Sequence, residues 1–287
     1  MPDISEYYTA DVLERLVRAA LDEDVGGVGD VTTMSLSHGV TKAKAVLTAG
    51  ACGVISGLPV AKAVFRVCEG TAKVDVLADE GAPVQAGQVI MRVKAGSDAL
   101  LRAERTALNF LQFMSGIATL TSRFVAAVAP FETRVFDTRK THPMLRTLEK
   151  YAVRCGGGCN HRMNLSGAIL IKDNHLTLAG GLTLAVEAAR AQWGDIYTIE
   201  VEVDTLEQLT EALGTSADLI MLDNMSAADV AEAVRVADGR KELEASGGIT
   251  LANARAYAAT GVGRISVGAL TISAPALDMA MHMARDH

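Results

Sequence analysis

The amino-acid sequence predicts an α/β protein whose second half forms a parallel sheet, and three observations support this prediction. After residue 130, short apolar runs alternate with segments of helical spacing. Polar side chains and glycines follow these apolar runs, as they do where the strands of α/β enzymes end. The chain of 287 residues is long enough for one large domain or two smaller ones.

The first half of the chain is expected to fold differently. Residues 9–23 have apolar positions at helical spacing behind Thr9, which predicts an amphipathic helix capped by that residue. The glycine-rich segment 24–33 is expected to be a connector, because nothing places it between a strand and a helix. Apolar runs separated by Gly and Pro between residues 43 and 95 predict a small sheet with one helix. A long apolar helix is predicted over residues 100–128.

In the second half of the chain, six predicted strands alternate with predicted helices. The predicted strands cover residues 133–138, 168–173, 197–204, 218–224, 242–246 and 263–268. The predicted helices between them cover residues 182–192, 205–213, 226–237 and 250–260. This order implies parallel strands joined by right-handed crossovers, in either an open sheet or a closed barrel. The polar residues at the strand ends are therefore expected to meet at one pocket.

Composition narrows the class of protein. A formal net charge of −7 and a pI of about 5.4 argue against a general affinity for nucleic acid or anionic membranes. The sequence has no uninterrupted apolar stretch of about 18 residues and no signal-peptide pattern, so a cytoplasmic location is expected. The four cysteines are expected to be free thiols. A metal site at Cys155, Cys159 and His161 is disfavoured by its unusual spacing.

Positive charge gathers between residues 137 and 175. This window holds seven of the 27 Lys and Arg residues and three of the six His, against three acidic residues. Lys150 and Arg154 are four residues apart and are expected on a solvated helix face. The remaining strand-end and loop cations suit a small substrate with several negative charges, because Arg binds carboxylates and phosphates through two hydrogen bonds. These cations are Arg139, Lys140, Arg162 and Lys172.

Acidic residues and glycines complete the predicted pocket. Glu200, Glu202 and Asp204 share one face of a strand, and Asp223 ends the next strand. Glu202 and Asp223 are candidates for binding Mg²⁺, which takes one or two carboxylates together with substrate phosphates. The segment Ser246, Gly247 and Gly248, together with Gly268, offers backbone N–H groups to a phosphate. The residues alone thus predict an enzyme for a phosphorylated substrate and a carboxylate-bearing one.

Several ordered motifs make the chain resemble the quinolinate phosphoribosyltransferase family, also called nicotinate-nucleotide pyrophosphorylase (carboxylating). They are AERTALNFLQFMSGIATLT, DTRKT, LEKYAVRCGGG, NHR, LIKDNH, IEVEVDTLEQL, IMLDN, SGGIT and GVGRISVGALT, and they span Leu21 to Asp278. The resemblance implies a type II phosphoribosyltransferase fold. An N-terminal α/β sandwich domain is expected at 1–115 and an incomplete, TIM-like α/β barrel at 116–274, with a C-terminal helix at 275–287 that joins the first domain.

The resemblance also implies a reaction and a set of site residues. Quinolinate and phosphoribosyl pyrophosphate are converted to nicotinate mononucleotide, pyrophosphate and CO₂ with Mg²⁺. The implied catalytic residues are Lys140, Lys172, Glu202 and Asp223, the last two also near the metal. The implied substrate-binding residues are Thr138, Arg139, His161, Arg162, Lys172, Ser246, Gly247, Gly248 and Gly268, with Arg105 from a second subunit. A homodimer with shared active sites is implied, and assembly into a hexamer is left open.

The chain departs from the family pattern near the implied substrate loops. His142, Met144, Asn164, Gly167 and Ile272 replace the residues that are usual there. Two alternatives therefore accompany the main hypothesis. The first is a paralogue that acts on another acid or serves molybdenum uptake, and the second is a non-catalytic binding protein on the same fold. The retained Lys140, Glu202 and Asp223 argue against the second.

Overall fold

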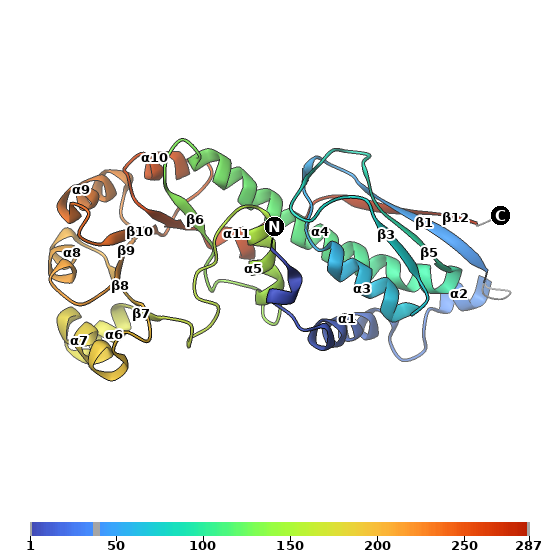
Figure 1. Ribbon diagram of the computed structural model, residues 1–287, viewed down its shortest axis with the longest axis horizontal. Coiled ribbons are helices and arrows are strands. Elements are labelled where there is room, and N and C mark those ends of the chain that lie inside the picture. The colour runs from blue at the N-terminus through green and yellow to red at the C-terminus, as the bar shows by residue number, and fades with distance from the viewer. Residues whose placement is uncertain (1, 37–40, 286–287) are drawn as a thin grey trace. The chain divides into compact units, whose positions relative to one another are not determined.

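The structure, a computed structural model, describes residues 2–36 and 41–285 and divides into two compact units (Figure 1). Unit 1 comprises Met1–Ser122, Thr147–Gly157 and Ala274–His287, and unit 2 comprises Arg123–Arg146 and Gly158–Ser273. Both units combine helices with a sheet, so the α/β prediction is confirmed.

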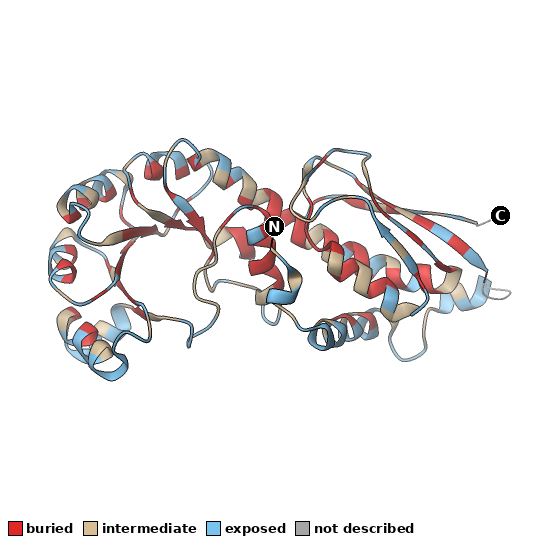
Figure 2. Ribbon diagram, viewed as in Figure 1, coloured by how far each residue is buried: buried red, intermediate tan, exposed pale blue. Residues whose placement is uncertain are grey.

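Unit 1 is built on an antiparallel four-stranded sheet with the order β12-β1-β5-β3. Its strands are β1 (Lys42–Ala49), β3 (Lys73–Val76), β5 (Val89–Gly96) and β12 (Met279–Arg285). Alternate residues such as Leu47, Val93 and Met281 are buried, so one face of the sheet belongs to the core (Figure 2). The remaining elements of the first half are η1 (Ile4–Glu6), α1 (Ala10–Val25), α2 (Val31–Leu36), β2 (Gly53–Val54), α3 (Leu58–Cys68), β4 (Pro83–Val84) and α4 (Ser97–Val128).

The helices of unit 1 follow the sequence patterns closely. Thr9 caps α1 by accepting a hydrogen bond from the Val12 backbone N–H, as predicted. The predicted connector at 24–33 is partly wrong, because α2 begins at Val31 with Asp30 accepting hydrogen bonds from Thr33. Helix α4 is long and apolar enough to cross a membrane by length and composition alone. Within its most apolar window, 56% of the residues are buried in the fold, which is typical of a core helix.

Two predictions for unit 1 are wrong. Residues 279–285 form strand β12 rather than part of a helix, because Met279 and Met281 point into the core at every second position and pair with β1. Residues 286 and 287 of the predicted helix lie outside the described part. Lys150, on α5 (Arg146–Cys155), is fully buried instead of solvated, whereas Arg154 is exposed as expected.

Unit 2 contains a parallel six-stranded sheet with the order β6-β11-β10-β9-β8-β7. The strands are β6 (Arg134–Phe136), β7 (Ile169–Ile171), β8 (Ile199–Val203), β9 (Leu219–Asp223), β10 (Glu242–Ser246) and β11 (Arg264–Ser266). The helices are α6 (Asp173–Ala179), α7 (Leu182–Trp193), α8 (Leu206–Leu213), α9 (Ala227–Ala237), α10 (Ala254–Ala258) and α11 (Ala269–Ile272). Figure 1 shows α7 to α10 along the outer side of the curved sheet.

The sheet of unit 2 is an incomplete barrel. Strands β6 and β7 form its two edges, and no ladder joins them among residues 2–36 and 41–285. The segment around Cys159 extends the β6 edge, because Cys159 N–H donates to the Val135 carbonyl at 2.7 Å and Asp137 N–H donates to the Cys159 carbonyl at 3.1 Å. This pairing brings residues 160–162 to the inner side of the sheet, next to the strand ends.

Candidate active site

Two arginines stand together at the β6 side of the strand ends. Arg139 follows β6, and Arg162 follows the segment that pairs with β6. The Nε atoms of both are buried without a hydrogen-bond partner, while Arg162 Nη1 donates to the Ala168 carbonyl at 2.9 Å. Burial, followed by the positive charge of Arg139, lowers the pKa of Arg162. We call these residues the arginine pair. Two mutually repelling cations with unused donors are a site for an anion of more than one charge.

His161 lies between the arginine pair and the interior of the sheet. Its Nε2 is 2.9 Å from Glu200 Oε2 and 3.7 Å from Glu244 Oε1. Its Nδ1 accepts the backbone N–H of Arg162 at 2.9 Å. Its own backbone N–H donates to Asp137 Oδ1, also at 2.9 Å. Both ring nitrogens of His161 therefore already have partners within unit 2.

A second group of charged residues lies at the ends of β7, β8 and β9. Lys172 and Glu202 form an ion pair, and Asp223 is close enough for its charge to act on both. Burial is the main cause that raises the pKa of Glu202, and it likewise raises the pKa of Asp223. The charge of Lys140 acts on Asp223 in the opposite direction. We call these four residues the acid–lysine cluster. Desolvated carboxylates with an incomplete set of cations favour binding of a further cation.

Glycine turns border this cluster. Gly247 has a φ of +90°, and an added Cβ would lie 2.2 Å from the Asn224 amide oxygen, so only glycine fits. At Gly268, an added Cβ would come within 3.0 Å of the Lys140 side chain. Lys140 is held by its backbone, since its N–H donates to Thr138 Oγ1 at 3.0 Å and its carbonyl accepts from Thr271 Oγ1 at 2.5 Å. Backbone atoms at these turns can approach a ligand closely.

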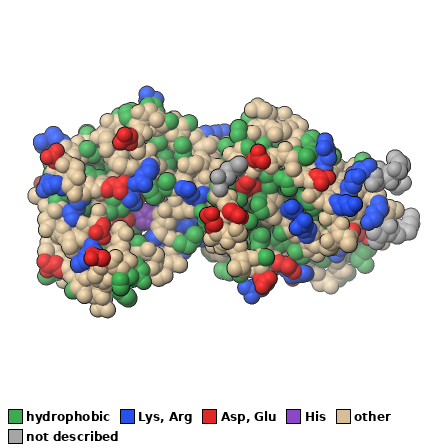
Figure 3. All heavy atoms as spheres, in the orientation of Figure 1, with side chains coloured by type: hydrophobic (Ala, Val, Ile, Leu, Met, Phe, Trp, Pro, Cys, Tyr) green, Lys and Arg blue, Asp and Glu red, His purple; other side chains and the backbone are tan. Residues whose placement is uncertain are grey.

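Almost all residues predicted for the site therefore come together in unit 2. The strand ends and loops carry Thr138, Arg139, Lys140, His161, Arg162, Lys172, Glu202, Asp223, Ser246, Gly247, Gly248 and Gly268. Figure 3 shows basic, acidic and histidine side chains gathered over the inner side of this unit. Arg105 belongs to unit 1, where its side chain is exposed on α4. Arg146 begins α5, and its guanidinium bonds to Thr141 and the Met163 carbonyl.

Glu244 is the main residue that the sequence did not point to. It is fully buried in the middle of β10, and its pKa is raised to about 7, first by burial and then by the charge of Glu200. The available signal was the pattern ELEAS, in which an acid occupies a central position of an otherwise apolar strand. With His161 and Glu200 it forms a group whose potential ligand atoms lie within 4.8 Å of one another. Neither Cys155 nor Cys159 belongs to such a group among the residues described.

The positions that depart from the family pattern lie on loops or at a helix end. Met144 has a φ of +65° and is 89% exposed, so a bulky residue occupies a conformation that favours glycine. His142 is half-buried in the same loop, while Asn164 and Gly167 are exposed. Ile272 is exposed at the end of α11. None of these side chains replaces a member of the arginine pair or the acid–lysine cluster.

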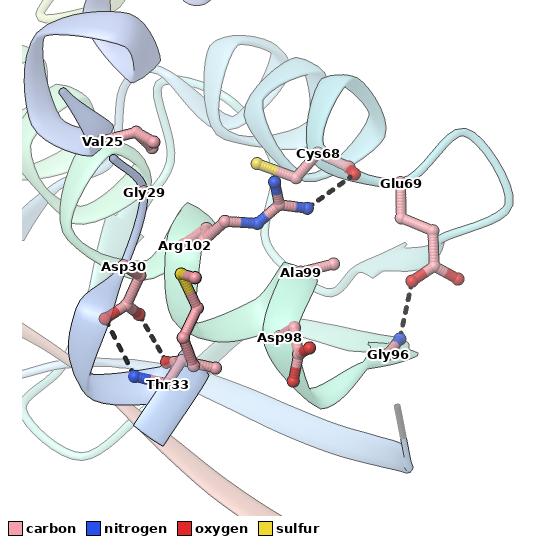
Figure 4. A pocket seen from close by; sticks show the side chains of 11 residues that line it. Val25, Gly29, Asp30, Thr33, Cys68, Glu69, Gly96, Asp98, Ala99 and Arg102 are labelled. Atoms are coloured by element: carbon pink, nitrogen blue, oxygen red, sulfur yellow. Dashed lines mark hydrogen bonds between the residues drawn. The ribbon is translucent and has the colours of Figure 1, made fainter. Parts of the chain in front are cut away.

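Unit 1 contains a cavity of different character (Figure 4). It has a volume of about 400 Å³ and lies among α2, the end of α3 and the start of α4. Asp30, Glu69 and Asp98 line it, with Arg102 as the one basic residue among its lining residues. All three acids already accept hydrogen bonds, from Thr33, from the Gly96 backbone N–H and from the Ser97 hydroxyl. The excess of carboxylates makes this cavity unsuitable for a polyanionic substrate.

Fold and site together define a class of enzyme. An incomplete α/β barrel whose strand ends combine an arginine pair, an acid–lysine cluster and glycine turns is suited to join an anionic acid to a phosphorylated substrate. Comparison with known families makes the assignment particular. The model of the quinolinate phosphoribosyl transferase N-terminal domain matches residues 30–115, and that of the C-terminal domain matches residues 117–282. The chain belongs to the quinolinate phosphoribosyltransferase family.

Similar proteins cover nearly the whole chain. It is 41% identical over 280 residues to a probable nicotinate-nucleotide pyrophosphorylase [carboxylating] of Synechocystis, covering 96% of this chain and 94% of that protein. The corresponding enzyme of Mycobacterium leprae is 42% identical over 278 residues, which cover 95% of this chain and 98% of that protein. A solved nicotinate-nucleotide pyrophosphorylase from Francisella tularensis superimposes with a TM-score of 0.93 at 38% identity, over 99% of this chain and 100% of that one.

Proposed function

We propose that this protein transfers the phosphoribosyl group of phosphoribosyl pyrophosphate to quinolinate, with loss of CO₂. The products are nicotinate mononucleotide and pyrophosphate, so the reaction belongs to NAD biosynthesis. The observation that carries this proposal is the arginine pair, whose buried Nε atoms lack partners and whose charges repel each other. Quinolinate carries two carboxylates and supplies the two charges that such a pair needs.

The arginine pair and Lys172 bind the two carboxylates of quinolinate. Arg139 and Arg162 present planar guanidinium groups that suit bidentate binding of a carboxylate. Lys172 pairs with Glu202 of the acid–lysine cluster. It therefore links the subsite for the quinolinate carboxylates with the subsite for the sugar. A carboxylate placed against Lys172 therefore brings the pyridine ring next to the sugar subsite. Arg105 of a second subunit adds a further cation to the acid, as the family resemblance implies.

Phosphoribosyl pyrophosphate binds on the other side, over the ends of β8 to β11. Lys140 neutralises the pyrophosphate, while the backbone of Ser246 to Gly248 and of Gly268 holds the 5′-phosphate. Glu202 and Asp223 fit Mg²⁺, because both are partly buried carboxylates whose pKa values are raised mainly by burial, and a bound cation would compensate that cost. When bound, Mg²⁺ neutralises charge on the leaving pyrophosphate.

The chemistry follows from holding the two substrates side by side. The lone pair of the quinolinate nitrogen forms the bond to the ribose C1 as the C1–O bond breaks and pyrophosphate leaves with that electron pair. Glu202 and Asp223 stabilise the positive charge that develops on the sugar. The bond from ring C2 to its carboxylate then breaks, CO₂ leaves, and the electron pair remains on C2 next to the positive ring nitrogen. A proton from solvent completes nicotinate mononucleotide.

The protein acts as a homodimer in the cytoplasm. One subunit's Arg105 completes its partner's site, which makes each site dependent on two chains. Further assembly into a hexamer is compatible with this arrangement. Mixing Arg105→Ala subunits with Lys140→Ala subunits should partly restore activity, since a mixed dimer contains one site with neither substitution. Mixed dimers that stay as inactive as their parents would contradict a shared site.

A direct assay tests the proposed function. Purified protein with Mg²⁺, quinolinate and phosphoribosyl pyrophosphate should release CO₂ and form nicotinate mononucleotide in equal amounts. Nicotinate in place of quinolinate should react poorly, because it offers one carboxylate to the arginine pair. Turnover of nicotinate or another pyridine acid without turnover of quinolinate would overturn the proposal.

A further inference from the structure

A pair of buried glutamates contacts His161, the residue that precedes Arg162 of the arginine pair. Glu200 is 4% exposed and Glu244 is fully buried, and both belong to the inner face of the sheet. Three of their four carboxylate oxygens are buried without a hydrogen-bond partner. Buried carboxylate oxygens without hydrogen bonds are costly, so a role beyond packing is needed to explain two such glutamates in contact range of one histidine.

The two glutamates converge on the ring of His161. Glu200 Oε2 lies 2.9 Å from His161 Nε2, and Glu244 Oε1 lies 3.7 Å from the same nitrogen. The opposite ring nitrogen accepts the backbone N–H of Arg162 at 2.9 Å. The chain of contacts therefore runs from two β-strands through one imidazole to the backbone of an arginine in the anion site.

The proton on the ring is located by these contacts. Because Nδ1 accepts a backbone N–H, it cannot carry a proton of its own, and the ring proton lies on Nε2. This proton faces Glu200. The same assignment argues against a metal ion among His161, Glu200 and Glu244, since a protonated Nε2 has no lone pair for a metal. The positive charge of Arg264, which acts on both glutamates, argues in the same direction.

We propose that Glu200 and Glu244 are positioning residues for quinolinate, which act by holding His161 in one orientation and, through it, Arg162. This inference rests on the proposed function. Glu200 is the acceptor of the Nε2 proton, and Glu244 is the second carboxyl group beside the same nitrogen, at 3.7 Å. The family resemblance implies that His161 contacts quinolinate directly, whereas here its ring nitrogens already have partners in Glu200 and Arg162.

The charge of Glu200 has a second consequence for the anion site. It acts on Arg162 against the effects of burial and of Arg139, and so offsets part of the repulsion between the two guanidinium groups, which are always charged. Glu200 balances only one of the two positive charges of the arginine pair. The second carboxylate of the substrate supplies the negative charge that is still needed. Loss of Glu200 should therefore weaken binding of the acid and leave the phosphoribosyl side intact.

Steady-state kinetics of paired variants test this proposal. Glu200→Leu leaves a buried N–H without an acceptor and should raise the KM for quinolinate by about tenfold or more. The KM for phosphoribosyl pyrophosphate should change by less than about twofold, within the error of such comparisons. Glu200→Gln keeps an acceptor for the Nε2 proton, and Glu244→Gln keeps a neutral polar group of similar shape, so both variants should be clearly less impaired than Glu200→Leu. Glu211→Gln, an exposed hydrogen-bonded residue on α8, serves as the matched control and should behave as wild type.

Two kinetic results would overturn the proposal. One is an equal effect of Glu200→Leu on both substrates, and the other is a Glu200→Gln variant as impaired as Glu200→Leu. Nitrogen NMR of histidine-labelled protein without substrates gives an independent answer, even for variants that fold poorly. His161, assigned by comparison with a His161→Gln variant, should carry its proton on Nε2 in the wild type and in Glu200→Gln.

The NMR measurement also separates this proposal from the proposed function. A protein that shows the Nε2 proton but does not turn over quinolinate would contradict the function and leave the positioning contact in place. Conversely, a proton on Nδ1 in an enzyme active on quinolinate would overturn the positioning role alone. Stoichiometric zinc in the purified protein, lost in Glu244→Gln, would replace the proton with a metal and would also overturn it.

Discussion

The two ends of the six-stranded sheet differ in how completely their charged side chains are paired. At the amino ends of the strands, Glu242 accepts hydrogen bonds from Arg134 at 2.6 Å and Arg264 at 2.5 Å. At the carboxyl ends, no carboxylate among the described residues forms an ion pair with Arg139 or Arg162, and the Nε atoms of both are buried without partners. Paired charges at one end serve the stability of the fold, and incompletely paired charges at the other end leave interactions for a ligand to complete.

The largest expected effect tests the carboxyl end. Arg162→Ala removes one of the two guanidinium groups and should lower kcat/KM for quinolinate by about 100-fold or more. Arg134→Ala, which removes a half-exposed arginine from the opposite end, should change kcat/KM by less than about twofold. Similar losses in the two variants would show that the ends do not differ in the way described.

The pH dependence of stability should also differ between two glutamates of the same strand. The pKa of Glu244 is raised to about 7, so the folded protein holds a proton that the unfolded chain releases above its ordinary pKa. Its contribution to the free energy of unfolding is therefore greatest in acid and falls by about 3 kcal/mol as the pH rises through 7. Urea unfolding at pH 5 to 8 should show this slope in the wild type and a flatter one in Glu244→Gln.

The contribution of Glu242 to the free energy of unfolding should depend on pH in the opposite direction. Hydrogen bonds from Arg264, opposed by burial and aided by Arg134, lower the pKa of Glu242. Its contribution is present above the unfolded pKa and is lost as the pH falls through the folded value. Glu242→Gln should therefore lose stability near neutrality and lose none at pH 3. A Glu242→Gln variant that is equally destabilised at both pH values would contradict the ion-pair explanation.

Glycines at the two ends provide a smaller contrast. Gly247→Ala should destabilise the protein by about 2 kcal/mol and raise the KM for phosphoribosyl pyrophosphate, because the new Cβ meets Asn224. Gly261 lies near the amino end of β11 with a φ of +84°, and an added Cβ there has ordinary space. Gly261→Ala should therefore cost about 1 kcal/mol in thermal or urea unfolding without a change in either KM.

The smallest effect concerns the loop after Lys140. Met144 is exposed with a positive φ, so its side chain contributes strain and little burial. Met144→Gly should stabilise the folded protein by about 0.5 kcal/mol, the relief of strain being partly offset by the greater entropy of the unfolded chain. Chemical unfolding measures this change. A clear loss of stability would mean that the Met144 side chain has a contact that its exposure does not suggest.

The contrast between the two ends also explains what the sequence could predict. All six strands of unit 2 were predicted, because their apolar runs are short and separated by well-formed amphipathic helices. The residues after each strand were recognised because polar groups at strand ends stand out from apolar surroundings. The sequence alone therefore predicts every member of the arginine pair and of the acid–lysine cluster.

The failures have particular physical causes. Helix α6 begins at Asp173 with no connector after β7, because His175 and Lys172 form reciprocal backbone and side-chain hydrogen bonds that no hydropathy pattern reveals. Strand β12 alternates Met with Ala or His, a pattern that also suits a helix until its partner β1 is known. Glu244 escaped notice because an isolated acid in a strand acquires meaning only from His161, which lies 83 positions earlier and meets it through tertiary folding.

Strand β12 makes the order of synthesis matter. Its pairing with β1 joins residues 279–285 to residues 43–49, while the whole of unit 2 lies between them in the chain. During translation, every strand of unit 2 emerges before the sheet of unit 1 receives its fourth member. Until then β1 presents an open edge, the kind of surface on which chaperones act and at which aggregation begins. The unit that is synthesised first is therefore the one that is completed last.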